Sequence, residues 1–211
     1  MNITKINSKT INQSIAKMRP DLEISTAEFR QLCEKIFNIL LTSYFKNFKG
    51  DKNKIGLTII LRAASAGWLA MKNRLLKYNM PIFLTWVNRD EITVKASTLN
   101  CNLPQKVNSN MPALILETMC ATATSVDETM KQLLKRGFKE KNITFICAVA
   151  SPEGLTFLQE NYPQLKVITG FTGPHIGLNE KKYIIYLDNK KMVVGDAGDR
   201  WMGISSKGKL L

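Results

Sequence analysis

The middle of the chain reads Ala113-Leu-Ile-Leu-Glu117-Thr-Met-Cys-Ala-Thr122-Ala-Thr124-Ser125, and this stretch decides the fold class. The segment Ala113–Leu116 is an apolar run of strand length that ends at a carboxylate. The segment Thr118–Ser125 is a loop of small and hydroxyl residues. The segment Val126–Arg136 has apolar residues at helical spacing and is followed by Gly137, which is typical of a helix C-terminus. A strand, a loop and a helix are therefore predicted in this order.

Similar units lie on both sides of this stretch. Apolar, β-branched runs predict further strands at Gly56–Leu61, Pro81–Val87, Ile143–Ala150 and Val167–Gly170. Helical spacing and capping residues predict further helices at Ser25–Tyr44, Ala63–Leu76 and Pro152–Glu160. Because strands and helices alternate, we expect an α/β fold with a mainly parallel sheet flanked by helices.

The C-terminal part has a different pattern. Two short apolar segments, Tyr183–Leu187 and Met192–Val194, flank the polar residues 188–191, which is typical of a hairpin turn. We expect the 211 residues to form a single domain. Residues 1 to about 24 would be its N-terminal helical arm, and residues from about 171 to 211 a small β hood.

Charge limits the classes of partner. The chain has 30 Lys and Arg against 17 Asp and Glu, a net charge of +13, which attracts anions such as nucleic acid, an acidic membrane surface or a phosphorylated substrate. The basic groups are not interleaved with stacking aromatic residues, so we do not expect a nucleic-acid partner. No apolar run reaches the roughly 20 residues of a membrane span, and the N-terminus lacks an apolar signal segment. We therefore expect a cytoplasmic protein with no membrane contact.

The four cysteines are far apart and form no Cys-x-x-Cys pair. Zinc sites and disulfide frameworks have closer spacing. We expect buried or half-buried free thiols and no protein-held metal. These residues are Cys33, Cys101, Cys120 and Cys147.

The loop after Glu117 has the composition of an anion site. Small side chains let backbone N–H groups approach an oxyanion, Thr and Ser hydroxyls add donors, and a helix N-terminus favours negative charge. A carboxylate at the strand end can hold paired ribose hydroxyls or a metal. A sugar phosphate is the ligand this predicts, although an ordinary strand and helix joined by a Ser/Thr cap would have a similar sequence. The Walker and dinucleotide-binding glycine patterns are absent from this loop.

This loop resembles the Asp-Pro-Met-Leu/Cys-Ala-Thr-Gly/Ala-Gly-Ser motif of the uracil phosphoribosyltransferases. Other segments resemble that family's motifs in the same order along the chain. They are Ser25-Thr26 with Phe29-Arg30, Ile60-Leu61-Arg62-Ala63, Arg89-Asp90-Glu91-x-Thr93 with Leu103-Pro104, Leu178-Asn179-Glu180-Lys181-x-Tyr183-Ile184, and Gly195-Asp196-Ala197-Gly198-Asp199-Arg200 with Gly203.

The resemblance implies the type I phosphoribosyltransferase fold and a reaction. Such enzymes transfer phosphoribosyl from phosphoribosyl pyrophosphate to uracil and release UMP and pyrophosphate, with Mg²⁺ held by the donor. They form homodimers or higher homo-oligomers. Positioning and charge stabilisation are the protein's main tasks in such a reaction.

The resemblance also implies site residues. The catalytic residues would be Arg62, Arg89 and Asp196. The donor would be bound by Arg62, Arg89, Glu117, Met119, Ala121, Thr122, Ala123, Thr124, Ser125 and Asp196. The base would be bound, largely through backbone groups, at Tyr183, Ile184, Gly195, Asp196 and Ala197.

The sequence departs from the family's pattern at the site itself. Glu117 stands in place of Asp, Thr118 in place of Pro, and both Ala64 and Thr124 in place of Gly. A side chain at Thr124 would block close backbone approach if φ were positive there, in which case Thr124→Gly would raise activity; its hydroxyl could instead bind phosphate. The segment 185–194 replaces the family's Pro-Gly turn.

These departures leave alternatives open. The acceptor could be another base or ring compound, or the fold could have lost catalysis and serve as a ligand sensor or RNA-binding regulator. His175 is the single histidine. We expect it in a pocket wall or on a loop surface, with general acid or base catalysis as the alternative. We expect Trp68, Trp86 and Trp201 in the core or in a subunit interface.

Overall fold

The structure is a computed structural model of the chain, and it describes residues 1–62, 64–89, 96–179, 182–187, 191–204 and 210. For residues 88–89, 96–99, 178–179 and 182–183 it describes the backbone alone. Several predicted motif residues lie outside the described part. These are Ala63, Asp90, Glu91, Thr93, Glu180, Lys181 and the hairpin tip 188–190.

The central element is a seven-stranded sheet with the strand order β1-β7-β6-β5-β2-β3-β4. The strands are β1 (Asn2–Lys5), β2 (Gly56–Leu61), β3 (Ile82–Arg89), β4 (Ala96–Asn102), β5 (Ala113–Cys120), β6 (Ile143–Ala150) and β7 (Lys166–Thr172). All neighbouring strands in this described sheet pair in parallel except β3 and β4, which are antiparallel. The predicted α/β class with a mainly parallel sheet is confirmed.

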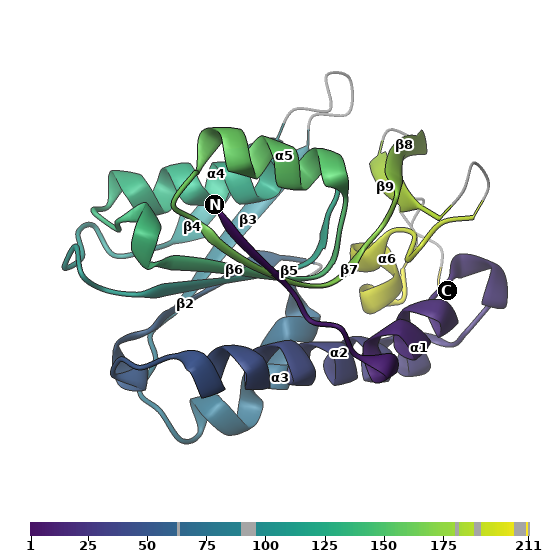
Figure 1. Cartoon of the computed structure of the whole chain (residues 1–211), viewed down its shortest axis with the longest axis horizontal. Helices are drawn as coiled ribbons and strands as arrows, with labels where there is room; N and C mark the ends of the chain where they lie inside the picture. The colour runs from purple at the N-terminus through teal and green to yellow at the C-terminus, as the bar shows by residue number, and fades with distance from the viewer. Residues whose placement is uncertain (63, 90–95, 180–181, 188–190, 205–209, 211) are drawn as a thin grey trace.

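Helices cover both faces of the sheet (Figure 1). The helices are α1 (Lys9–Lys17), α2 (Thr26–Asn47), α3 (Ser65–Leu75), α4 (Thr124–Lys135), α5 (Pro152–Asn161) and α6 (Ala197–Met202), with 3₁₀ turns at Pro20–Leu22, Lys52–Lys54 and Glu140–Asn142. Figure 1 shows α4 and α5 on one face and α2 and α3 on the other. A two-stranded antiparallel sheet of β8 (His175–Asn179) and β9 (Lys182–Tyr186) lies beside α6 at one end.

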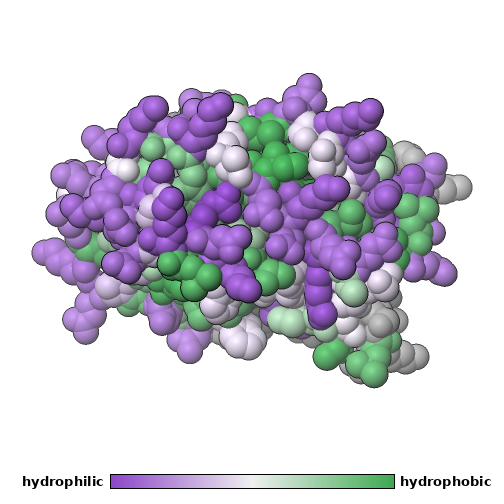
Figure 2. All heavy atoms as spheres, turned by 90° about the horizontal axis from the view of Figure 1, so that it is seen from below, coloured by the Kyte–Doolittle hydropathy of each residue, from purple (hydrophilic) through white to green (hydrophobic). Residues whose placement is uncertain are grey.

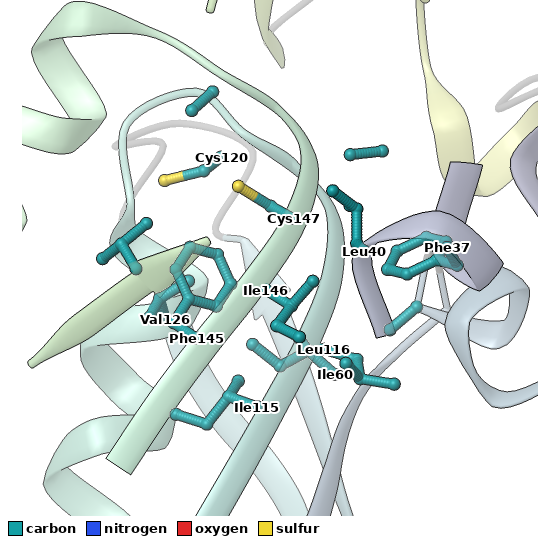
Figure 3. Close-up of a cluster of buried hydrophobic side chains, with 14 of the residues drawn as sticks. Phe37, Leu40, Ile60, Ile115, Leu116, Cys120, Val126, Phe145, Ile146 and Cys147 are labelled. Carbon is teal, nitrogen blue, oxygen red and sulfur yellow. The ribbon is translucent and has the colours of Figure 1, made fainter. Parts of the chain in front are cut away.

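The core occupies both sides of the sheet because the central strands are buried on both faces. All eight residues of β6 are buried, and successive side chains of a strand point to opposite faces. Figure 3 shows Phe145 beside Val126 of α4, and Ile146 and Leu116 on the side of Leu40 of α2. Buried parallel strands have continuous apolar sequences, and this is why the sequence predicted them.

The start of α2 follows the predicted capping pattern. Ser25 Oγ accepts a hydrogen bond from Glu28 N at 3.2 Å, so the first helical residue is Thr26. The predicted end of the strand that begins at Ala113 was wrong. The structure extends β5 to Cys120 because Glu117, Met119 and Cys120 continue the parallel pairing with β6.

Two strands of the seven-stranded sheet, β1 and β4, were not predicted. Strand β1 lacks an apolar run and is exposed at all four residues, and it forms the edge of the sheet by pairing with β7. Strand β4 returns antiparallel to β3. Of the two places predicted for the tryptophans, Trp68 and Trp86 do not lie in the core, since they are 38% and 49% exposed, and a subunit interface stays a prediction for them. Trp201 is partly buried against the core.

The cysteine prediction is confirmed for all four residues. Three are buried, Cys101 is half-buried, and all are free. Burial raises the pKa of the Cys147 thiol to about 12, against a smaller lowering by a hydrogen bond with Thr169. Burial also raises the pKa of Cys33, so the thiols of Cys33 and Cys147 are both protonated at neutral pH.

The outer face formed by the N-terminal helices is mostly hydrophilic, with separate apolar areas (Figure 2). Large apolar side chains of α3 contribute exposed surface, since Leu69 is 45% and Leu76, directly after α3, 80% exposed. None of the described helices is both long enough and apolar enough to cross a membrane.

Arg200 attaches helix α6 to the N-terminal helices through several contacts. Arg200 Nη1 donates to the carbonyl of Val194 at 2.7 Å and to the carbonyl of Met18. Its guanidinium also lies over the Phe29 ring of α2, 4.4 Å from the ring centre. Burial lowers the pKa of Arg200, yet two carbonyls and an aromatic face compensate the buried charge.

We predict that Arg200→Ala lowers the free energy of unfolding by about 3 kcal/mol, because two carbonyls lose their donor. Arg30→Ala is the control. Arg30 also joins α2 to α6, through the Trp201 carbonyl at 2.9 Å, but it is exposed and should matter by less than about 1 kcal/mol. Urea denaturation measures both variants, and equal losses would contradict the anchoring role of Arg200.

Candidate functional site

The sheet has a topological switch point between β2 and β5. These strands pair in parallel, with Ile59 opposite Leu116. The chain leaves β2 into α3 on one face and leaves β5 into α4 on the other (Figure 1). In open α/β sheets, ligands bind beyond the carboxyl ends of the strands where the connections diverge in this way. The candidate site is therefore defined by the residues that follow Leu61 and Cys120.

The connection from β5 to α4 is shorter than predicted. Glu117 and Thr118 lie inside β5, with Glu117 opposite Cys147 and 8% exposed. Met119 is partly buried against the core. Only the residues 121–123 link the strand to α4. Glu117 therefore lies four residues before the start of the loop rather than at its edge, which corrects the predicted position.

The positive φ in this loop belongs to Ala123 and not to Thr124. Ala123 is the N-cap residue of α4 and has φ 62° and ψ 5°, in the left-handed region. This conformation costs an L-residue about 1 to 2 kcal/mol. Thr124 is the first residue of α4. The sequence-based expectation that Thr124→Gly would relieve the loop is therefore not supported.

Hydroxyl groups surround the first turn of α4. Thr122 Oγ1 and Thr124 Oγ1 are 3.0 Å apart and share a hydrogen bond. Ser125 follows, 7% exposed, and its carbonyl accepts from Thr129 Oγ1 at 2.9 Å. The first amides of a helix have no acceptor within that helix, and the helix dipole is positive at this end. These amides and hydroxyls together suit an anion.

Across the switch point, Arg62 follows β2 directly. Its Nη2 donates to Asp199 Oδ1 at 3.1 Å, and the Arg62 side chain is 46% exposed while that of Asp199 is 7% exposed. Arg62 also has its carbonyl fixed by Ser65 Oγ at 2.7 Å. A guanidinium has five N–H donors, so one bond to Asp199 orients Arg62 and leaves donors for an anion.

The C-terminal motif forms the cap of α6. Asp196 Oδ1 accepts from Asp199 N at 2.8 Å, which makes Asp196 the N-cap residue. Gly195 precedes it with φ 73°, where a Cβ would lie 2.8 Å from Pro20 Cγ. Ala197 is buried at the first position of α6. Asp196 caps α6, and Asp199 of the same helix binds Arg62. Asp196 is therefore linked to Arg62 through α6.

The predicted hairpin is confirmed outside its tip. Leu187 N donates to the Lys191 carbonyl at 2.7 Å, and Val193 N donates to the Ile185 carbonyl at 2.8 Å. Through this pairing the segment that follows Val193 lies antiparallel to β9. Gly195 and the buried Ile184 therefore belong to the same small C-terminal unit. The predicted base-binding segments are thus neighbours.

His175 and Tyr186 form the outer part of this unit. Their rings stack with centres 5.8 Å apart and an angle of 13° between their planes. Both residues are half-buried. Gly177 lies under the same tyrosine ring, since a Cβ there would be 2.9 Å from Tyr186 Cε2. His175 therefore lies in strand β8 and not in a loop, and its place in a pocket wall stays a prediction.

Two predicted side chains cannot be placed. Arg89 is the last residue of β3 and Tyr183 lies in β9, but the side chains of both are outside the described part. One functional candidate was missed. Asp199 lies in the quoted C-terminal motif, but its ion pair joins residues 137 apart in sequence and has no local signal.

A surface cavity of about 610 Å³ lies elsewhere on the molecule. It lies along the outer side of α1 and α2, and its lining contains none of the predicted site residues. The lining residues are Thr10, Gln31, Glu34, Lys35, Asn38, Ile39 and Thr42. Among the described residues, no three His, Cys, Asp or Glu side chains group as metal ligands would.

Comparison with known proteins gives the family. The model of the family described as uracil phosphoribosyltransferase matches residues 46–203. This chain belongs to the uracil phosphoribosyltransferase family. The matched residues include both sides of the switch point and the whole of the α6 motif.

Two family members and one solved structure are similar to this chain, each over a different length. A uracil phosphoribosyltransferase of Dictyostelium discoideum is 42% identical over 117 residues, 56% of this chain and 50% of the relative. One of Campylobacter fetus is 33% identical and is covered over 96% of its length by 94% of this chain. The AQ2163 protein of Aquifex aeolicus has the same fold, with a TM-score of 0.79 at 19% identity, over 97% of this chain and 99% of that one. The chain thus spans about half the length of the Dictyostelium relative and nearly all of the Campylobacter one.

We predict that the strain at Ala123 is measurable by comparison with Ala64. Both alanines are buried N-cap residues, but Ala64 has φ −72° and Ala123 has φ 62°. Replacement by Gly removes one buried methyl at each position, so the difference isolates the backbone. Ala123→Gly should retain about 1 to 2 kcal/mol more stability than Ala64→Gly in urea denaturation. Equal losses would contradict the left-handed conformation of Ala123.

Proposed function

We propose that this protein transfers phosphoribosyl from phosphoribosyl pyrophosphate to uracil, releasing UMP and pyrophosphate. One observation carries the proposal: Arg62 after β2 and the loop 121–123 after β5 lie at adjacent strand ends, and Asp199 joins Arg62 to the base-binding segments. Membership of the family supports the choice of reaction. No feature of the described residues favours another acceptor or an RNA-binding role.

The 5′-phosphate of the donor binds at the start of α4 in this proposal. Backbone amides at Thr122–Ser125 and the hydroxyls of Thr122 and Thr124 supply donors, and the helix dipole adds positive potential. Glu117 and Met119 lie on the strand that leads into this loop, where the family resemblance expects ribose hydroxyls to bind. The glutamate is one methylene longer than the family's aspartate, so a retracted position within β5 suits its length.

Arg62 binds the pyrophosphate of the donor. A guanidinium binds two phosphate oxygens at once, and its charge stabilises the leaving group as the bond to C1′ breaks. Arg89 is proposed for the same task, at the end of the neighbouring strand β3. We propose that Mg²⁺ enters with the donor, where it neutralises pyrophosphate charge.

The base binds under the small C-terminal unit. Backbone groups of Tyr183, Ile184, Gly195 and Ala197 are proposed to bind it, and Asp196 lies between base and ribose. A ring nitrogen forms the new bond to C1′ and loses its proton. Since the sugar gains positive charge in the transition state, a carboxylate such as Asp196 stabilises it at close range.

We also propose that residues 1–211 form one domain and that the protein is a homo-oligomer. In support, a single hydrophobic cluster includes residues from Ile11 to Ala197. Exposed apolar side chains on and beside α3 suit a second copy of the chain. These are Trp68, Leu69 and Leu76.

We predict that the double variant Leu69→Asp with Leu76→Asp shifts the oligomer toward monomer, because charges replace exposed apolar surface. Sedimentation velocity measures the mass. An oligomer of unchanged mass would mean that α3 is not the interface, and a monomeric unmodified protein would contradict the oligomer itself.

We predict that the unmodified protein forms UMP from phosphoribosyl pyrophosphate, uracil and Mg²⁺, as read by mass spectrometry. Arg62→Ala should raise the KM for the donor about ten- to hundredfold, through the loss of charge-assisted hydrogen bonds. Arg74→Ala is the matched control. Arg74 lies on α3, where it bonds Ala70 O and Thr42 Oγ1, and its removal should leave the KM for the donor unchanged. Absence of UMP would contradict the proposed function, and equal effects would contradict the role of Arg62.

A further inference from the structure

Ser151 lies at the junction of β6 and α5 and bonds to the neighbouring loop. Its Oγ accepts from Gly154 N at 2.8 Å, which makes it the N-cap of α5. The same Oγ donates to the carbonyl of Ala121 at 2.5 Å, and Ser151 N donates to the Cys120 carbonyl at 2.9 Å. Ser151 is completely buried. Two successive carbonyls, at the point where β5 becomes the loop, are thus bound by one residue.

The first turn of α5 also lies against the loop. A Cβ placed on Gly154 would be 2.6 Å from the Ala121 carbonyl oxygen and 3.0 Å from that of Cys120. Real Cβ atoms do not approach oxygen so closely, so a side chain at this position would push the loop away. The close contact shows that the Ala121 carbonyl points toward α5.

The direction of this carbonyl determines the direction of the next amide. In a trans peptide the C=O and the following N–H are held in one plane and point to opposite sides. Since the Ala121 carbonyl points to Ser151 and α5, the Thr122 N–H points the other way. Ala123, two residues on, then turns the chain into α4 with its positive φ.

We propose that Ser151 is a positioning residue for the donor: its hydroxyl holds the Ala121 carbonyl so that the Thr122 amide faces the 5′-phosphate. This inference rests on the proposed function, since it needs the loop to bind a phosphate. A residue that acts only as a helix cap would stabilise the fold without affecting the phosphate. Mutation can separate the positioning role from the capping role, because Gly at an N-cap position destabilises a helix only slightly.

The test compares variants that remove different parts of the serine's bonding. Ser151→Gly removes the hydroxyl bond to Ala121 with little loss of the cap, and Ser151→Thr keeps a hydroxyl. Gly154→Ala displaces the same carbonyl by steric contact. Ser8→Ala is the matched control, because Ser8 caps a different helix, α1, by accepting from Ile11 N at 3.4 Å.

Calorimetry with ribose 5-phosphate measures phosphate binding directly, and initial rates give KM for donor and uracil. We expect Ser151→Gly and Gly154→Ala to weaken ribose 5-phosphate and to raise the KM for the donor about tenfold each, with the KM for uracil changed less than twofold. Ser151→Thr should recover most of the affinity, and Ser8→Ala should bind as the unmodified protein does. Unchanged binding in a folded Ser151→Gly protein would overturn the inference.

Different results would contradict the proposed function and the inference about Ser151. If the unmodified protein binds ribose 5-phosphate but forms no UMP, the reaction is wrong and the binding comparison still decides the role of Ser151. If the unmodified protein binds neither ribose 5-phosphate nor phosphoribosyl pyrophosphate, both are overturned. Thermal melting of each variant shows that a loss of binding does not come from unfolding.

Discussion

The pairing of β5 with β2 on one edge and with β6 on the other fixes the positions of Arg62, the loop 121–123 and Ser151. The β2 pairing brings Arg62 beside the end of β5, and the β6 pairing brings Ser151 to the carbonyls of Cys120 and Ala121. Both pairings are buried under helices on the two faces of the sheet (Figure 1). Because a buried parallel ladder has one register, the site is set within the most rigid part of the fold.

The C-terminal motif performs three separate tasks with three side chains of one helical turn. Asp196 caps α6, Asp199 pairs with Arg62, and Arg200 attaches the turn to Phe29, Met18 and Val194. Arg200 is thus a structural anchor, while Asp199 connects the donor side of the site to the base side. A short motif can determine a site in this way when a buried cation fixes it to two other helices.

The sequence predicted the elements whose pattern is local and missed contacts that depend on distant segments. The apolar run of β6 and the Ser25 cap of α2 could be predicted from the sequence, and six motifs in one order carried the resemblance to the family. The end of β5 was misplaced because Glu117–Cys120 are strand residues through their pairing with β6. The positive φ at Ala123, the Arg62–Asp199 pair and the Ser151–Ala121 bond had no signal, since each needs the folded arrangement of segments up to 137 residues apart.

A crystal structure of the protein with UMP bound tests the central claim most directly, because the product reports the phosphate and base positions together. The account predicts the 5′-phosphate on the amides of residues 122–125 at the start of α4, and the uracil ring against Ile184, Gly195 and Ala197. UMP with its phosphate away from this loop, for example in the cavity along α1 and α2, would contradict the assignment of the site.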